Sequence, residues 1–291
     1  MSEVLLEFSS NISQVATDFL KQTDETHMEK LFRSFADFLL SSSNVDCLPV
    51  NLAKIRRKHN FKKHFAQDIN QRGFLLGNNI FIKGEDSRVV QRFTEAHEMM
   101  EALYLALKVE RPRRFSDDEW TNFLKSKEGL CNSGAAELLM PTHFFLPIVE
   151  ANGIGLATGS ELASLCKTSL TATIRQMVYS DVSSCVFGYL QEGYRKSEQA
   201  LIDAGKGSNL KPKLRVFRGW RSPHTEEFLC TNESFAENTS FYETLRANIS
   251  GDIKYSRDKL DLKKFRGVFD TESMLVMIND IRTVLAFIHL N

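Results

Sequence analysis

A histidine and two glutamates stand at helical spacing inside one long predicted helix, and no other feature constrains the fold as strongly. The helix is expected from Arg88 to about Leu107, with Arg111-Pro112 ending it. Residues four apart share a helix face, so His97 and Glu101 can hold one metal ion side by side. Glu98 would then act as the general base for a water that the metal activates.

The pair His97-Glu98 begins the motif H-E-x-x-H, in which two histidines of one helix bind zinc. Glu101 occupies the position of the second histidine. An isolated His-Glu pair occurs by chance in many helices, so this interpretation needs support from elsewhere in the chain. That support comes from residues 128–141, which read EGLCNSGAAELLMP.

Together, the run RFTEAHE at 92–98 and the run NSGAAELLMP at 132–141 resemble the ImmA/IrrE family of metallopeptidases. A weaker likeness includes the helix that opens near Pro49 and a β-hairpin over residues 72–82, so the resemblance spans about residues 45–290. In that family an acidic residue just before an Ala-Asn pair is the third metal ligand. Cys131-Asn132 stands at that pair here, which makes Glu128 the corresponding acid.

The resemblance therefore implies a metal site formed by His97, Glu101 and Glu128, with a water in the fourth position. One histidine and two carboxylates depart from the family's two histidines and one acid. The additional carboxylate makes the site harder and more negative, which weakens zinc binding relative to a two-histidine site and makes manganese or iron more plausible. Zinc remains the first candidate, with manganese and iron as alternatives. The opposing interpretation is a degenerate site that has lost its metal and retains Glu98 and Glu101 as ordinary helix acids.

His143 follows directly after the helix that carries the third ligand. It is a candidate for orienting a ligand from outside the coordination sphere, against the alternative of a surface or capping histidine. Arg92, near the start of the motif helix, is interpreted as a structural anchor.

The resemblance implies an α+β, mostly helical chain with a zincin-like minimal peptidase domain, a helix-turn-helix-like segment and a small GAF-like C-terminal domain. The predicted division is residues 1–44 (an N-terminal helical extension), 45–152 (the metallopeptidase-like domain), 153–203 (the helix-turn-helix-like segment) and 204–291 (the sensing-type α+β domain). Helices are expected over residues 3–41, 51–66 and 128–140, and strands at 214–217 and 284–288.

Composition restricts the compartment and the partners. Thirty-seven basic and 37 acidic side chains cancel, so no overall field draws the chain toward nucleic acid or membrane. Five cysteines without C-x-x-C spacing argue against a disulfide framework or a zinc ribbon. The N-terminus lacks the pattern of a signal peptide, and no apolar run could span a bilayer. These features indicate a protein of the bacterial cytoplasm.

Two features point weakly toward DNA. A basic stretch from Lys54 to Lys63 could contact phosphates, although a solvated helix face explains it as well. The second helix of the helix-turn-helix-like segment offers only Arg175 and Gln176 for base contacts, so direct DNA binding is not expected.

The preferred hypothesis is a metallo-endopeptidase. By resemblance, its substrate would be a helix-turn-helix transcriptional repressor, cleaved in a stress or mobile-element response. The alternative is a catalytically degenerate relative that regulates a partner by binding without cleavage. The oligomeric state is left open by the sequence.

Overall fold

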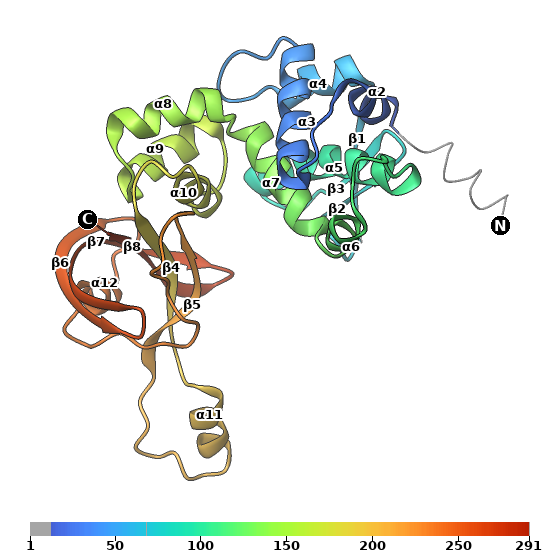
Figure 1. The fold of residues 1–291 in the computed structure, drawn as a ribbon. Coiled ribbons are helices and arrows are strands. Elements are labelled where there is room, and N and C mark those ends of the chain that lie inside the picture. The colour runs from blue at the N-terminus through green and yellow to red at the C-terminus, as the bar shows by residue number, and fades with distance from the viewer. Residues whose placement is uncertain (1–12, 68, 291) are drawn as a thin grey trace. The chain divides into compact units, whose positions relative to one another are not determined.

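The computed structural model describes residues 13–67 and 69–290, and these form two compact units. The first unit comprises the described residues up to Phe145 together with Leu162–Ala172, and the second comprises Leu146–Glu161 and the residues from Thr173 onward. The chain is α+β, as expected, with helices dominating the first unit and a larger sheet in the second (Figure 1). Within the described ranges, no helix is both long and apolar enough to cross a lipid bilayer.

The first unit packs helices around a small three-stranded sheet. Its elements are α2 (Gln14–Gln22), α3 (Met28–Ser42), α4 (Leu52–His59), β1 (Lys62–Ala66), β2 (Gly73–Leu76), β3 (Asn79–Lys83), α5 (Arg88–Val109), α6 (Asp117–Lys125) and α7 (Lys127–Leu139). The strand order is β1-β3-β2, with β1 parallel and β2 antiparallel to β3. Helix α5 packs on β2 and β3, and α7 packs on both α3 and α5. The motif helix is therefore buried between the sheet and a helical layer.

The expected N-terminal helices correspond to α2 and α3, whereas the part of that prediction at residues 3–12 lies outside the described residues. Phe19 of α2 lies against Phe35 of α3, with ring centroids 5.1 Å apart. Because α3 also packs on α5 and α7, this segment is attached to the body of the first unit. The burial of its apolar face explains the helical spacing seen in the sequence.

The helix expected over residues 51–66 is wrong in its second half. Helix α4 ends at His59 because Asn60 adopts a left-handed conformation with φ of 60° and caps it. The chain then continues as β1, which pairs with β3. The apolar and basic residues of 61–66 fit either a helix face or a short strand. They form a strand because their backbone pairs with β3.

Three helices link the units: α8 (Thr142–Asn152), α9 (Leu156–Cys166) and α10 (Leu170–Tyr179). The turn after α9 places Lys167 in the left-handed region, with φ of 54°. This pair of helices agrees with the expected helix-turn-helix-like pattern. The expected helical segment 153–203 nevertheless also contains a strand, β4 (Cys185–Gly193), because its apolar residues Cys185–Phe187 and Leu190 are buried in the sheet of the second unit.

The second unit is a five-stranded antiparallel sheet in the order β5-β4-β8-β7-β6. Its further strands are β5 (Lys213–Arg221), β6 (Ile253–Leu262), β7 (Phe265–Ile278) and β8 (Ile281–His289). Helix α12 (Ser240–Ala247) packs on β6, β7 and β8, and α11 (Lys196–Asp203) projects from the connection between β4 and β5 (Figure 1). Buried Asp258 of β6 accepts from the Ser240 amide at 2.9 Å, which fixes the start of α12.

Candidate metal centre

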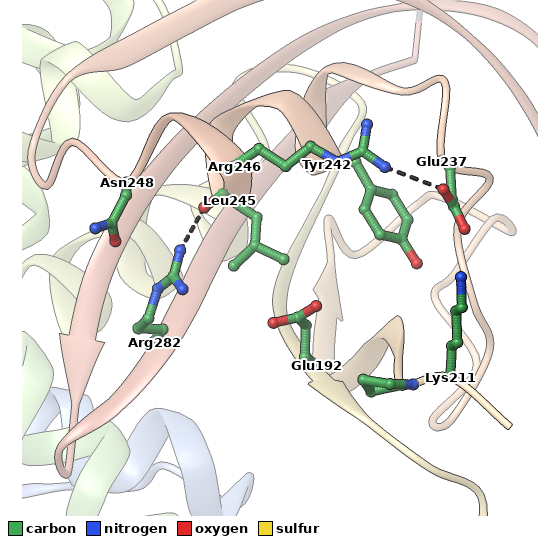
Figure 2. Close-up of a pocket in the computed structure, with 9 residues that line it drawn as sticks. Glu192, Lys211, Glu237, Tyr242, Leu245, Arg246, Asn248 and Arg282 are labelled. Atoms are coloured by element: carbon green, nitrogen blue, oxygen red, sulfur yellow. Dashed lines mark hydrogen bonds and ion pairs between the residues drawn. The ribbon is translucent and has the colours of Figure 1, made fainter. Parts of the chain in front are cut away.

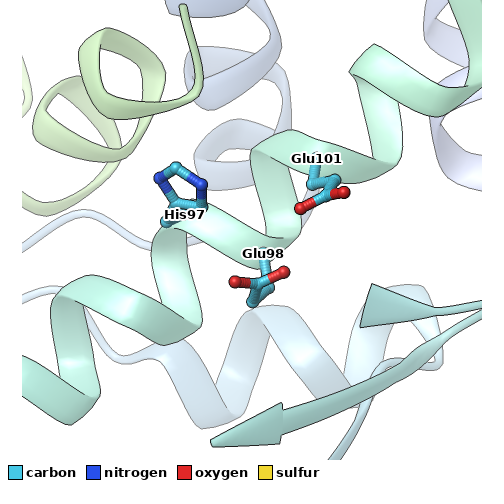
Figure 3. A group of neighbouring side chains, drawn as sticks. All are labelled: His97, Glu98 and Glu101. Carbon is cyan, nitrogen blue, oxygen red and sulfur yellow. The ribbon is translucent and has the colours of Figure 1, made fainter. Parts of the chain in front are cut away.

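Helix α5 supplies the central residues of the candidate site. Ser87 caps the helix by accepting a hydrogen bond from the Val90 amide. Burial of Met99, Met100 and Leu103 on the neighbouring layers holds the helix in place. The side chains of His97, Glu98 and Glu101 project from consecutive turns of this helix (Figure 3).

The structure brings His97, Glu98 and Glu101 into one group. One ligand atom of each lies within 4.8 Å of those of the other two, a spacing at which a single cation can contact all three. Glu98 is only 4% exposed, whereas His97 and Glu101 are half-buried. Gly73 lets the start of β2 approach closely, because a Cβ there would lie 2.4 Å from Thr94 Cγ2 and 3.3 Å from Glu98 Oε1.

Glu98 lies in an environment that opposes its charge. Burial, the negative charge of Glu101 and a hydrogen bond to Glu101 raise the pKa of Glu98 from its ordinary 4.5 to about 8. Its Oε2 atom is buried without a hydrogen-bond partner among the described residues. Two carboxyl groups held this close need either a shared proton or a cation between them.

Asn132 of α7 orients His97. Its Oδ1 atom lies 3.0 Å from His97 Nδ1, so Nδ1 donates to the amide oxygen and Nε2 remains available as a ligand. The second sequence motif contains Asn132, but the motif did not predict it as a site residue. Its place in that motif was the signal that could have identified it.

Lys127, at the start of α7, was missed by the sequence analysis. Its Nζ atom donates to Glu101 Oε1 at 2.5 Å and lies 5.8 Å from the centre of the Tyr104 ring. Burial works against the charge of Lys127, but the hydrogen bond and the charge of Glu101 outweigh it and raise the lysine pKa. The Lys127 ammonium therefore neutralises Glu101, which together with Glu128 was predicted as a carboxylate ligand of the metal.

Glu128, the expected third ligand, is close to this group without belonging to its compact part. Its Oε2 lies 3.7 Å from His97 Nε2, and its side chain is 75% exposed. His143 is exposed at the start of α8, with its ring centroid 4.1 Å from that of Phe144. This geometry gives no support to His143 as a residue that orients a ligand.

The residues present fit a divalent cation. One imidazole nitrogen and carboxylate oxygens form a donor set used by zinc, manganese and iron. The unpaired Glu98 Oε2 and the clustering of like charges are the features that a bound cation would relieve.

Residues 48–176 match the family model of the IrrE N-terminal-like domain, peptidase M78. The match covers the motif helix, the second motif and the group on α5. This part of the chain is therefore similar to the IrrE N-terminal-like domain. A search of proteins with curated function found no match in sequence.

A solved structure of a Mycobacterium tuberculosis transcriptional regulator is similar in fold to this chain. The TM-score is 0.58 at 8% identity, and the alignment covers 96% of this chain and 81% of the regulator. At that identity, the similarity concerns the fold alone.

Met100 of α5 lies opposite Gly134 of α7, where an added Cβ would lie 2.5 Å from Met100 Sδ. Met100 is fully buried, so it packs between α5 and α7.

Two residues of the basic stretch from Lys54 to Lys63 form ion pairs inside the first unit. Arg56 Nε lies 3.0 Å and Lys63 Nζ 2.8 Å from the two carboxylate oxygens of Glu95, which is buried on α5. These two cations therefore stabilise a buried acid two residues before His97, and a solvated face does not account for them.

The second unit has a pocket of its own, of about 440 Å³ (Figure 2). Arg246 pairs with Glu237 at 3.0 Å beside it, and Arg282 donates to the Leu245 carbonyl. Glu192 and Lys211 also line this mixed-charge pocket.

Proposed function

We propose that this protein is a metal-dependent endopeptidase of the ImmA/IrrE type. The observation that carries the proposal is the grouping of His97, Glu98 and Glu101 on α5, inside the part of the chain that matches the family. His97, Glu101 and Glu128 would hold a divalent metal, with zinc preferred to manganese or iron. When bound, the metal would supply Lewis-acid polarisation of a peptide carbonyl and acidify a water molecule.

Glu98 is the proposed general base. Its pKa near 8 in the metal-free protein reflects burial and the nearby Glu101 charge, both of which a cation would offset. The ionised carboxylate would then accept a proton from the attacking water and pass it to the leaving amine. Asn132 would keep the His97 ring in one orientation and one tautomer throughout.

The peptide substrate is proposed to bind in an extended conformation along β2. This strand lies at an edge of the three-stranded sheet, and an edge strand can pair with an added strand through the backbone groups on its outer side. Gly73 at the start of β2 lies against Glu98, which brings such a peptide to the general base. A substrate peptide paired with β2 could continue beyond both ends of this strand. This arrangement therefore supports cleavage within a polypeptide chain.

The proposed substrate is a helix-turn-helix transcriptional repressor, and its cleavage would relieve repression in a stress or mobile-element response. Cleavage of a repressor would take place in the cytoplasm. The second unit would serve as the sensing part, with the pocket beside Arg246 and Arg282 as its ligand site. Direct DNA binding is not part of this proposal.

A second candidate is a non-cleaving regulator, and the contact between Lys127 and Glu101 favours it. An internal ammonium 2.5 Å from Glu101 can replace a metal as the source of positive charge. The protein would then bind its partner through the same surface without hydrolysing it.

Two measurements separate these candidates. Purified protein is incubated with zinc, manganese or ferrous iron and dialysed, and the bound metal is measured by elemental mass spectrometry. We expect near-stoichiometric metal in wild type and loss of metal in His97→Ala and Glu101→Gln. The control variant is Glu110→Gln, which changes an exposed glutamate just after the same helix and should retain the metal. Wild type that stays empty with all three metals contradicts the peptidase proposal.

Cleavage is then tested by labelling new N-termini in cells that express wild type or Glu98→Gln. The Glu98→Gln variant retains the proposed ligands and loses the base. New termini in a repressor that require Glu98 support endopeptidase activity. Metal binding without any Glu98-dependent terminus supports the non-cleaving regulator instead.

A further inference from the structure

Three segments distant in sequence meet around a pocket of about 720 Å³ in the first unit. Four basic side chains line it, and together they define what we call the basic pocket. They are Lys63 of β1, Arg88 and Arg92 of α5, and Lys167 of the turn between α9 and α10. None of the described residues that line this pocket is acidic.

The four cations differ in how they are paired. Lys63 is neutralised by buried Glu95, and Arg92 donates to the carbonyl oxygens of Val50 and Cys166 at 3.0 and 3.5 Å. Arg88 and Lys167 are exposed, and their side chains form no hydrogen bond or ion pair with any other described residue. The basic pocket thus carries two positive charges, on Arg88 and Lys167, that no acidic side chain among the described residues neutralises.

Arg92 also has an unsatisfied donor. Its Nε atom is buried and has no hydrogen-bond partner among the described residues, although both contacts of its Nη2 atom anchor the side chain. A buried donor without an acceptor is costly, and an anion seated in the pocket is a natural acceptor for a guanidinium.

The backbone strengthens the positive field at this point. Arg88 and Val89 form the first turn of α5, a helix of 22 residues, where free amides and the helix dipole favour an anion. Lys167 occupies a left-handed position with φ of 54°, where glycine or asparagine would fit with less strain. A lysine there brings a charge to the pocket at a conformational cost.

We propose that the basic pocket binds a small phosphate-bearing organic molecule of about nucleotide size. The phosphate would lie between Arg88, Arg92 and Lys167, and Val89 and Ala163 would provide apolar surface for the organic part. The volume of about 720 Å³ falls within the range of pockets that hold such ligands. Duplex DNA fits less well, because the chain has no net charge and only four cations line the pocket.

The test is isothermal titration calorimetry of the full chain with ADP, inorganic pyrophosphate and adenosine. The double variant Arg88→Gln/Lys167→Gln removes the two exposed unpaired charges. The matched control, Lys108→Gln/Lys125→Gln, removes two exposed lysines outside the pocket. Neither pair belongs to the metal centre, so the result is independent of the proposed peptidase activity.

We expect ADP and pyrophosphate to bind to wild type and to the control variant with the same affinity within about twofold. Affinity should fall at least about tenfold in Arg88→Gln/Lys167→Gln, and adenosine should bind at least about tenfold more weakly than ADP. Failure of both phosphate compounds to bind overturns the proposal, as does binding that the double variant leaves unchanged. Binding of a 20-base-pair duplex that depends on Arg88 and Lys167, without binding of ADP, would identify a DNA-backbone contact instead.

Discussion

Lys127 Nζ donates a hydrogen bond to Glu101 Oε1 at 2.5 Å, so the residue in place of the second motif histidine is already paired with a cation. This contact joins the start of α7 to the middle of α5. A metal and the Lys127 ammonium therefore compete for Glu101. A metal that binds Glu101 must either displace Lys127 or share the carboxylate with it.

Replacing Lys127 with methionine should tighten metal binding. The variant removes a competing cation and its repulsion of the metal, so we expect the zinc Kd to fall about tenfold, equivalent to roughly 1.4 kcal/mol. Competition with a chromogenic zinc chelator measures this, with Lys125→Met as the control for a lost surface charge. If Lys127→Met gains no metal and only lowers the unfolding temperature, the ion pair is structural and the non-cleaving candidate is favoured.

Glu101→His should convert the site to two histidines at positions i and i+4 of α5. Imidazole suits zinc better than a second carboxylate does, so we expect zinc affinity to rise by about tenfold or more and selectivity over manganese to increase. The same chelator competition, run with zinc and with manganese, compares wild type, Glu101→His and Glu101→Gln. Equal affinity of all three for zinc would show that Glu101 contacts no metal.

The stability of the metal-free protein should fall as the pH rises through the window set by Glu98. The pKa of Glu98 is about 8 in the folded protein against 4.5 ordinarily, so the folded state retains a proton that the unfolded state releases. The contribution of protonated Glu98 to the free energy of unfolding is fully present below about pH 4.5, and it is lost progressively as the pH rises to about 8.

Glu98→Gln removes this titration. We expect the Tm of this variant, measured with a chelator present, to exceed that of wild type by a margin that grows between pH 5 and pH 8.5. The margin should grow by about 2–4 °C for each kcal/mol that wild type loses in its free energy of unfolding. Glu110→Gln serves as the control, since that side chain is exposed. An advantage independent of pH would mean that the carboxyl is ionised throughout.

Gly134→Ala should destabilise the packing of α5 against α7. The new methyl would lie 2.5 Å from Met100 Sδ and 3.2 Å from the Phe32 carbonyl oxygen, so we expect a loss of about 1–3 kcal/mol in the free energy of unfolding. Chemical denaturation measures the loss. Gly129→Ala is the matched control, because nothing lies within 4 Å of a Cβ there.

The double variant Gly134→Ala/Met100→Ala tests the cause. Removing Cγ and Sδ of Met100 relieves the overlap, so the cost of the double variant should be smaller than the sum of the two single costs. Additive costs would assign the effect of Gly134→Ala to the Phe32 carbonyl instead.

Local patterns in the sequence were sufficient for several elements. The motif helix and the hairpin of β2 and β3 follow from helical spacing and turn residues within one segment. The helix over 51–66 failed because residues 62–66 pair with β3, a contact that no local pattern contains. Strand β4 was missed for the same reason, since its neighbours β5 and β8 come later in the chain.

The sequence by itself determined the motif residues and the face they share, since helical spacing brings His97, Glu98 and Glu101 together once α5 forms. Only the tertiary structure decided what surrounds them. Asn132 against His97 and Lys127 against Glu101 depend on how α7 packs on α5, and Lys63 against Glu95 depends on β1. Such contacts arise from burial of apolar faces far apart in the chain, so their partners cannot be inferred from spacing within a segment.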